Sequence, residues 1–138
     1  MLRPQPDDAQ ASRFELALPN SPAAAVLARR QFMTFIKHLR LNAAFASDME
    51  TAVGEALANA VEHGRRPHGT LVVQALLTGD GIDVTVSDDG PGFAPGPAGL
   101  DRPAVLAPRG YGIFLIRSVV DRVEFRDDGR TLWFRKHF

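Results

Sequence analysis

Two turn sequences constrain this chain more than any other feature, because each joins two runs of residues that favour β-strands. One turn spans residues 79–81 with the sequence Gly-Asp-Gly, and the other spans residues 127–129 with Asp-Asp-Gly. Glycine and aspartate tolerate the backbone angles of a tight reversal, so each turn predicts an antiparallel hairpin. A further short strand is predicted over residues 14–18, before Pro19. The four hairpin strands are predicted over residues 71–77, 82–86, 123–126 and 131–136.

Three other segments repeat apolar residues at the spacing of an α-helix. The first runs from residue 22 to about 41, and the third begins near Ile113. Between them, Ser47 followed by Glu50 forms a capping-box pattern, in which the serine accepts a backbone amide and the glutamate reaches back. This pattern predicts a second helix from that serine to about His63.

The composition indicates one domain without cysteine chemistry. The chain has 138 residues, of which 45% are apolar, which suffices for one core but not for two. We expect a loose polar tail over residues 1–12 and a single domain over residues 13–138. The 16 basic and 16 acidic residues cancel, which argues against binding to nucleic acid or to a membrane surface. The absence of cysteine excludes disulfides and thiolate zinc sites, and together with the absence of long apolar runs it favours a cytoplasmic protein.

The predicted second helix has one polar face and one apolar face. Glu55, Asn59 and Glu62 are spaced four and three residues apart, so they share one face of an α-helix. The opposite face carries the apolar residues Val53, Leu57 and Ala60. A polar helix face is usually solvated surface, so this pattern indicates a functional site only in combination with the other segments of the chain.

Two glycine-rich segments flank a long loop later in the chain. Asp88 directly follows a predicted strand, and Gly90 and Gly92 after it let the backbone approach a ligand closely. Beyond the loop, a Gly-x-Gly sequence opens the third helix, where unpaired amides favour an anion such as phosphate. The loop itself, residues 93–109, is rich in proline, and we expect it to act as a lid. Taken singly, each segment is also typical of an ordinary turn or helix start.

The order of these segments resembles that of the GHKL superfamily of ATP-binding proteins. Residues 55–64 resemble its N box, residues 88–93 its G1 box and residues 110–116 its G2 box. Residues 119–123 and 131–133 look most like the closing segments of bacterial anti-sigma factor serine kinases. The resemblance implies a Bergerat ATP-binding fold of class α+β. This is a two-layer α/β sandwich, in which three helices cover one face of a mixed, mainly antiparallel sheet.

The resemblance also implies a role for each matching residue. Glu55 would be the general base, Asn59 would bind a Mg²⁺ ion that bridges the phosphates, and Asp88 would accept a hydrogen bond from the adenine amino group. The remaining nucleotide contacts would come from Gly90, Gly92, Gly110, Gly112 and, through water, Thr131. Arg109 and Arg102, in or beside the lid, would clamp phosphate oxygens, unless they only keep the loop soluble.

The function implied by the resemblance is an ATP- and Mg²⁺-dependent protein serine/threonine kinase that phosphorylates a STAS-domain anti-anti-sigma partner. One alternative is a nucleotide-gated module that sequesters a sigma factor or another regulator with little turnover. Others are an excised histidine-kinase domain, although residues 1–21 leave no room for a dimerisation helix pair, and a partner-switching kinase in a pathway without a sigma factor. Phe32, Phe35 and Ile36 are candidates for a homodimer surface, whereas their ordinary role is packing on the sheet.

Overall fold

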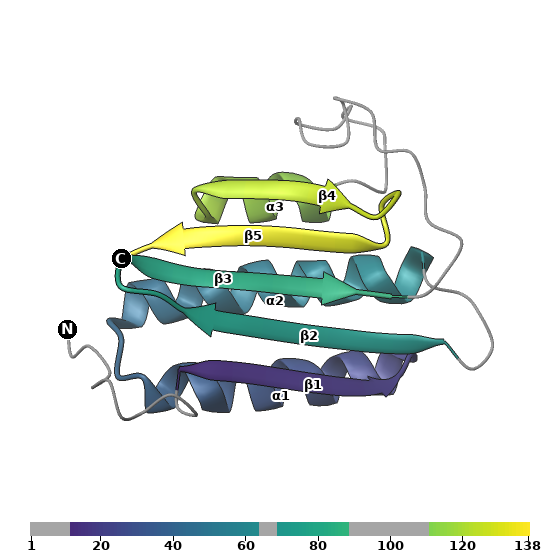
Figure 1. The fold of residues 1–138 in the computed structure, drawn as a ribbon, viewed down its shortest axis with the longest axis horizontal. Helices are drawn as coiled ribbons and strands as arrows, with labels where there is room; N and C mark the ends of the chain where they lie inside the picture. The colour runs from purple at the N-terminus through teal and green to yellow at the C-terminus, as the bar shows by residue number, and fades with distance from the viewer. Residues whose placement is uncertain (1–11, 64–68, 89–110) are drawn as a thin grey trace.

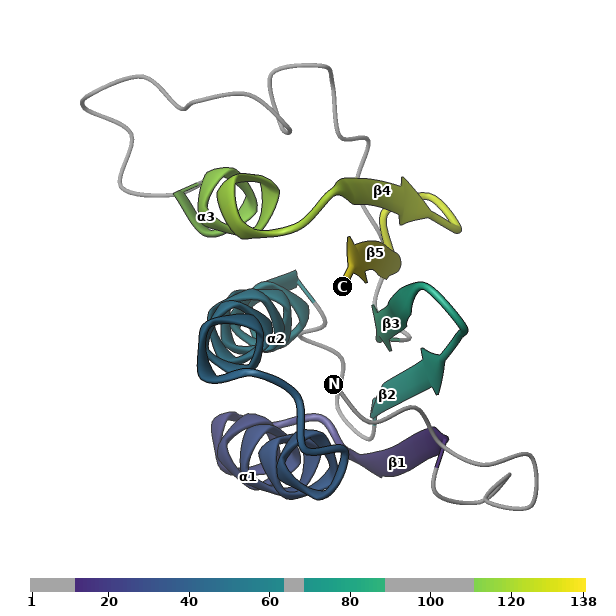
Figure 2. The same cartoon turned by 90° about the vertical axis from the view of Figure 1, so that its left-hand side faces the viewer.

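The computed structural model describes residues 12–63, 69–88 and 111–138, which form two layers (Figures 1 and 2). Within these residues, one layer is a five-stranded sheet and the other consists of three helices on one face of that sheet. The strands are β1 (Arg13–Pro19), β2 (Thr70–Leu77), β3 (Gly81–Ser87), β4 (Arg122–Arg126) and β5 (Thr131–His137). The helices are α1 (Pro22–His38), α2 (Ala43–His63) and α3 (Tyr111–Val119). The implied α+β sandwich is confirmed.

The strands lie in the order β1-β2-β3-β5-β4. Both predicted hairpins are confirmed, because β2 pairs with β3 and β4 pairs with β5. All pairings between described strands are antiparallel, so this part of the sheet is more regular than the mixed sheet that the resemblance implied. α3 and β4 come between β3 and β5 in the chain, and both lie at the same side of the molecule (Figure 1).

Strand residues alternate between an inner face, which the helices cover, and an outer face. In β3, Ile82, Val84 and Val86 are buried, while the residues between them are partly exposed. In β5, Leu132 and Phe134 continue the inner face. This period of two is the pattern of a half-buried strand, and it determines on which face each residue near a strand end lies.

α1 lies beside β1 at one edge of the sheet, and its apolar residues fill the core there (Figure 2). Phe32 and Ile36 are 0 and 1% exposed. Phe35 is partly buried and packs against Phe14, with 5.5 Å between the ring centroids. These side chains pack within the domain, which is their ordinary role, so Phe32 and Ile36 offer no surface to a second copy.

Two charged groups outside the core depart from their ordinary pKa values. A hydrogen bond of 2.8 Å from the Thr78 hydroxyl to the Asp80 carboxylate lowers the pKa of Asp80. Two hydrogen bonds from Arg135 to Asp83, of 2.6 and 3.1 Å, raise the pKa of that arginine. Both shifts favour the charged form that already prevails at neutral pH. These groups therefore act as fixed charges on the surface.

α2 begins about one turn earlier than the capping-box pattern predicts. The side-chain oxygen of Asn42 accepts a hydrogen bond of 2.7 Å from the Phe45 amide, so Asn42 is the N-cap. Ser47 lies exposed inside the helix instead. The prediction was wrong because asparagine caps a helix as well as serine does, and the earlier start buries Phe45 and Met49. The predicted end of the helix at His63 is confirmed.

Replacing Asn42 by alanine should lower the free energy of unfolding by about 1 kcal/mol, because the first turn of α2 loses its acceptor. Ser47→Ala is the matched control, and it should change stability by less than about 0.5 kcal/mol, as substitutions at exposed positions usually do. Urea denaturation followed by circular dichroism measures both changes. Equal losses in the two variants would place the start of the helix at Ser47.

Candidate functional site

The start of α3 lies directly against the polar face of α2. A Cβ atom placed on Gly112 would lie 2.9 Å from the Oε2 atom of Glu55, closer than neighbouring atoms tolerate. The carboxylate of Glu55 therefore lies close to the backbone of the first turn of α3. Amides at that end of a helix have no intrahelical partner and carry a partial positive charge. An acidic side chain and an anion-binding helix end are thus brought together from distant parts of the chain.

The polar residues of α2 lie along one partly buried face, as their spacing predicts. Glu55, Asn59 and Glu62 are each partly exposed. The opposite face is formed by Val53, Leu57 and Ala60, which are 0, 1 and 3% exposed. Asn59 lies one turn beyond Glu55, toward the end of α2. Figure 1 shows that α2 and β3 both end on the same side of the molecule.

Asp88 follows β3 at this side, on the inner face of the sheet. Its backbone amide donates a hydrogen bond of 2.9 Å to the carbonyl of Arg130, which extends the register of β3 and β5 by one residue. Because Val86 and Leu132 lie on the inner face, the alternation places partly buried Asp88 on that face too. The carboxylate of Asp88 therefore lies on the helical side of the sheet, just beyond the end of β3 and on the side of the molecule where α2 ends.

Thr131 lies on the outer face, away from the other candidate residues. Its hydroxyl donates a hydrogen bond of 3.0 Å to the carboxylate of Asp127 in the preceding turn. The alternation that turns Leu132 inward turns Thr131 outward, and its implied role beside the adenine stays a prediction. The backbone neighbour of Asp88 is Arg130, which the sequence interpretation did not name and whose guanidinium lies 3.4 Å from the carbonyl of Asp127 and 3.8 Å from the carboxylate of Asp128.

Several predicted site residues lie outside the described residues, so their roles stay predictions. They are Gly90, Gly92, Arg102, Arg109, Gly110 and the predicted lid over residues 93–109. In the part of the chain that the structure describes, no group of three His, Asp or Glu side chains is arranged to hold a metal ion by itself. None of the described helices has the length and apolar character needed to cross a membrane.

Lys136 of β5 holds α3 against α2 at the other end of the helix. Its Nζ atom donates a hydrogen bond of 2.7 Å to the carbonyl of Val119, the last residue of α3. The same atom lies 3.1 Å from the carboxylate of Asp48 on α2, and the lysine side chain is only 18% exposed. A cation at a helix C-terminus also complements the helix dipole. α3 is therefore linked to α2 at both of its own ends, by Lys136 and by the contact of Glu55 with Gly112.

Comparison with known proteins identifies the group to which this arrangement belongs. The family model described as "Histidine kinase-like ATPase domain" matches residues 18–136. The chain belongs to the histidine kinase-like ATPase family. The GHKL resemblance inferred from the three boxes is confirmed, and a family of ATPases implies that ATP is the ligand.

Similar curated proteins carry names from the anti-sigma factor group. A "Serine-protein kinase RsbW" of Listeria monocytogenes is 27% identical over 137 residues, which cover 91% of this chain and 87% of that protein. An "Anti-sigma F factor" of Oceanobacillus iheyensis is 28% identical over 120 residues, which cover 82% of each. A "Serine-protein kinase RsbW" of Halalkalibacterium halodurans is 33% identical over 89 residues, and the match spans only 55% of that relative. These modest identities support the anti-sigma kinase group.

A solved structure has the same fold. It contains the RsbU and RsbW domains of a Mycobacterium tuberculosis protein, and it superimposes with a TM-score of 0.64 at 19% identity. The match covers 91% of this chain and 31% of that longer chain. At this identity the likeness shows the fold alone.

The close approach of Glu55 to Gly112 predicts energetic coupling between the two positions. Gly112→Ala should destabilise the wild-type protein, because the new Cβ would lie 2.9 Å from the Glu55 carboxylate. In a Glu55→Ala background the conflict is absent, and the same change should be neutral or stabilising, since alanine favours helices. A double-mutant cycle measured by urea denaturation should give a coupling of about 0.5–3 kcal/mol. If the two effects simply add, the residues do not meet.

Proposed function

We propose that this protein is an ATP- and Mg²⁺-dependent protein serine/threonine kinase of the anti-sigma factor type. Its substrate is a STAS-domain anti-anti-sigma protein, which it regulates by partner switching. The observation that carries the proposal is the position of the Glu55 carboxylate against the first turn of α3. A base that activates a hydroxyl must lie where the phosphates are bound, and a helix start is such a place. The family and the names of the relatives support the same function.

The nucleotide is proposed to bind between α2, α3 and the end of β3. Its phosphate oxygens accept hydrogen bonds from backbone amides at the start of α3, where Gly112 has no side chain to obstruct them. The carboxylate of Asp88 accepts a hydrogen bond from the adenine amino group. An ionised carboxylate only accepts hydrogen bonds, so it favours adenine over guanine, which presents a carbonyl at the same position. Residues 90, 92, 109 and 110 are proposed to complete the pocket.

Asn59 fits a magnesium ion that is shared with the nucleotide. Mg²⁺ prefers oxygen ligands, and in phosphoryl-transfer sites it takes only one or two of them from the protein. The carboxamide of Asn59, one turn from Glu55, supplies one such oxygen. Among the described residues no cluster of three acidic or histidine side chains accompanies it, which matches a site with few protein ligands. When bound, the ion supplies neutralisation of the phosphate charge.

The chemical step transfers the γ-phosphoryl group of ATP to a hydroxyl of the partner. The hydroxyl oxygen forms a bond to the γ-phosphorus, the bond from that phosphorus to the bridging oxygen breaks, and ADP leaves. Glu55 orients the hydroxyl and accepts its proton. Because Glu55 is only partly buried, its carboxylate remains open to an incoming protein as well as to the nucleotide.

Glu55→Gln tests the role of this residue as a base. Glutamine keeps the size of the side chain but cannot take the proton, so kcat should fall about 10²–10⁴-fold while the affinity for Mg-ATP stays nearly the same. The assay incubates the purified protein with Mg-ATP and the STAS-domain proteins of the same organism, and mass spectrometry identifies phosphoserine or phosphothreonine. Glu15→Gln, an exposed change on β1, is the matched control and should behave like the wild type.

Undiminished turnover by the Glu55→Gln variant would remove Glu55 from the mechanism. If the folded wild-type protein phosphorylated none of these STAS-domain proteins, the kinase proposal itself would be wrong.

A second function, sequestration of a sigma factor, is favoured by the relative named as an anti-sigma F factor. In this case ATP gates the binding of the regulator, and little ATP is turned over. A reporter gene under the control of the sigma factor separates the two functions in cells. Under the kinase proposal, Glu55→Gln changes reporter expression because the partner is no longer phosphorylated. Under sequestration alone, expression stays at the wild-type level.

A further inference from the structure

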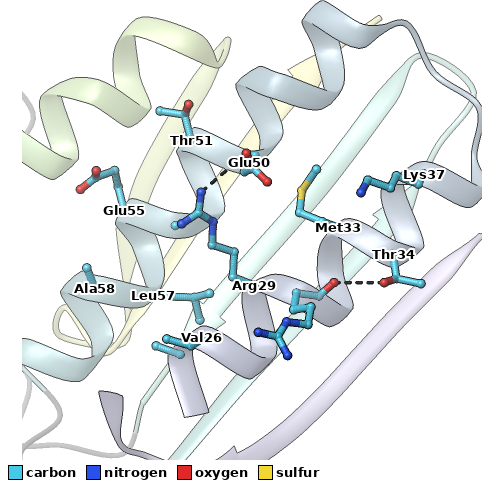
Figure 3. Close-up of a pocket in the computed structure, with 13 residues that line it drawn as sticks. Val26, Arg29, Met33, Thr34, Lys37, Glu50, Thr51, Glu55, Leu57 and Ala58 are labelled. Atoms are coloured by element: carbon cyan, nitrogen blue, oxygen red, sulfur yellow. Dashed lines mark hydrogen bonds and ion pairs between the residues drawn. The ribbon is translucent and has the colours of Figure 1, made fainter. Parts of the chain in front are cut away.

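A groove of about 630 Å³ runs between α1 and α2 on the helical side of the molecule (Figure 3). Three basic side chains of α1 line it, and all three are exposed: Arg29, Arg30 and Lys37. The described residues that line the groove include neither Asn59 nor Asp88. The groove is therefore distinct from the part of the proposed nucleotide pocket that Asn59 and Asp88 form, although Glu55 lines it as well.

The basic charge of the groove exceeds what its own carboxylates neutralise. Arg29 pairs with Glu50 at 3.6 Å, and the two side chains are 51 and 48% exposed. An ion pair as exposed as this is weak, so another carboxylate can compete for Arg29. In the part of the chain that the structure describes, Arg30 and Lys37 form no ion pair. Two cations are therefore available to an acidic ligand.

The groove leads across α2 to the proposed base. The side chain of Arg29 lies over Gly54, and its Nε atom would be 3.5 Å from a Cβ placed there. Ala58, one turn further along α2, is also small and is exposed. Glu55 lines the same groove, yet its carboxylate meets Gly112 of α3 on the other side of the helix. Figure 3 shows Glu55 pointing away from Arg29. A polypeptide in the groove therefore passes Arg29, which lies over Gly54, and the small side chain of Ala58 before it reaches the base.

We infer that this groove docks an acidic segment of the protein substrate, next to the hydroxyl that is phosphorylated. This inference rests on the proposed kinase function and adds the surface by which the substrate is recognised. Charge complementarity identifies the occupant, because its carboxylates pair with Arg30 and Lys37 and compete with Glu50 for Arg29. Val26, which lines the groove and is 60% exposed, supplies an apolar contact.

The double variant Arg30→Glu/Lys37→Glu tests the docking surface, because it reverses two charges and leaves Glu55 intact. The control Arg13→Glu/Arg122→Glu makes the same change in net charge on β1 and β4, at two arginines that lie on the outer face of the sheet and do not line the groove. Biolayer interferometry measures the affinity of each protein for the purified STAS-domain proteins of the same organism, and phosphorylation kinetics are measured in parallel. The groove variant should bind about tenfold more weakly, because it loses two exposed ion pairs and sets two new negative charges against the acidic segment.

In the kinetic assay, KM for the protein substrate should rise in the groove variant while kcat changes little, since the lost contacts bind rather than react. The control should match the wild type in both assays. Added NaCl should weaken binding by the wild type more than binding by the groove variant, because salt screens exposed charges.

The outcomes separate this inference from the kinase proposal. Wild-type affinity in the groove variant would overturn the docking surface and leave the kinase proposal standing. Weaker binding of Mg-ATP by the groove variant would assign the groove to the nucleotide and overturn the inference. A changed mass of this variant in light scattering would assign the groove to a second copy of the chain, which also overturns it. If the wild type phosphorylates no STAS-domain protein, the kinase proposal fails, while interferometry still tests docking. No binding of these proteins by the wild type would overturn the inference as well.

Discussion

Burial of the apolar face of α2 determines where the polar side chains on its opposite face lie. Met49, Val53 and Leu57 are at most 1% exposed, and each fully buried side chain of this size contributes about 1.5–3 kcal/mol. These contacts fix the rotation of the helix about its axis. A shift by one residue would turn the helix by about 100°, which would expose Leu57 and move Glu55 away from α3. The candidate base therefore owes its position to apolar packing on the opposite side of its own helix.

The position of α3, which forms the other side of the candidate site, depends on contacts made far from that site. α3 has 9 residues, and a helix this short is not stable in isolation. Ile113 and Ile116 anchor it in the core, with 6 and 0% of their surfaces exposed. Lys136 then binds its last carbonyl, and Gly112 lets its first turn approach Glu55 closely. A glycine at one end of α3 permits the close approach, and the cation of Lys136 binds the other end of the helix.

The sequence predicted those features that local patterns specify. The hairpins follow from turn chemistry and strand alternation, and the two faces of α2 follow from helical spacing, so these predictions are confirmed. The start of α2 was misplaced because two residues compete to cap the helix, and the burial of Phe45 decides for Asn42. The strand of Thr131 was predictable from local pattern, but its hydrogen bond to Asp127 in the preceding turn was not, and its role beside the adenine stays a prediction. The link through Lys136 joins segments distant in the chain, which no local pattern reveals.

The central claim is that the polar face of α2, the start of α3 and the end of β3 enclose one adenine nucleotide. Isothermal titration calorimetry of the folded protein with Mg-ATP tests it most directly. We expect one ATP per chain, bound at least about tenfold more weakly when Mg²⁺ is chelated or when Asp88→Asn replaces the charged acceptor of the adenine amino group. No uptake of nucleotide by the folded protein, or equal affinity in the Asp88→Asn variant and the wild type, would contradict this site.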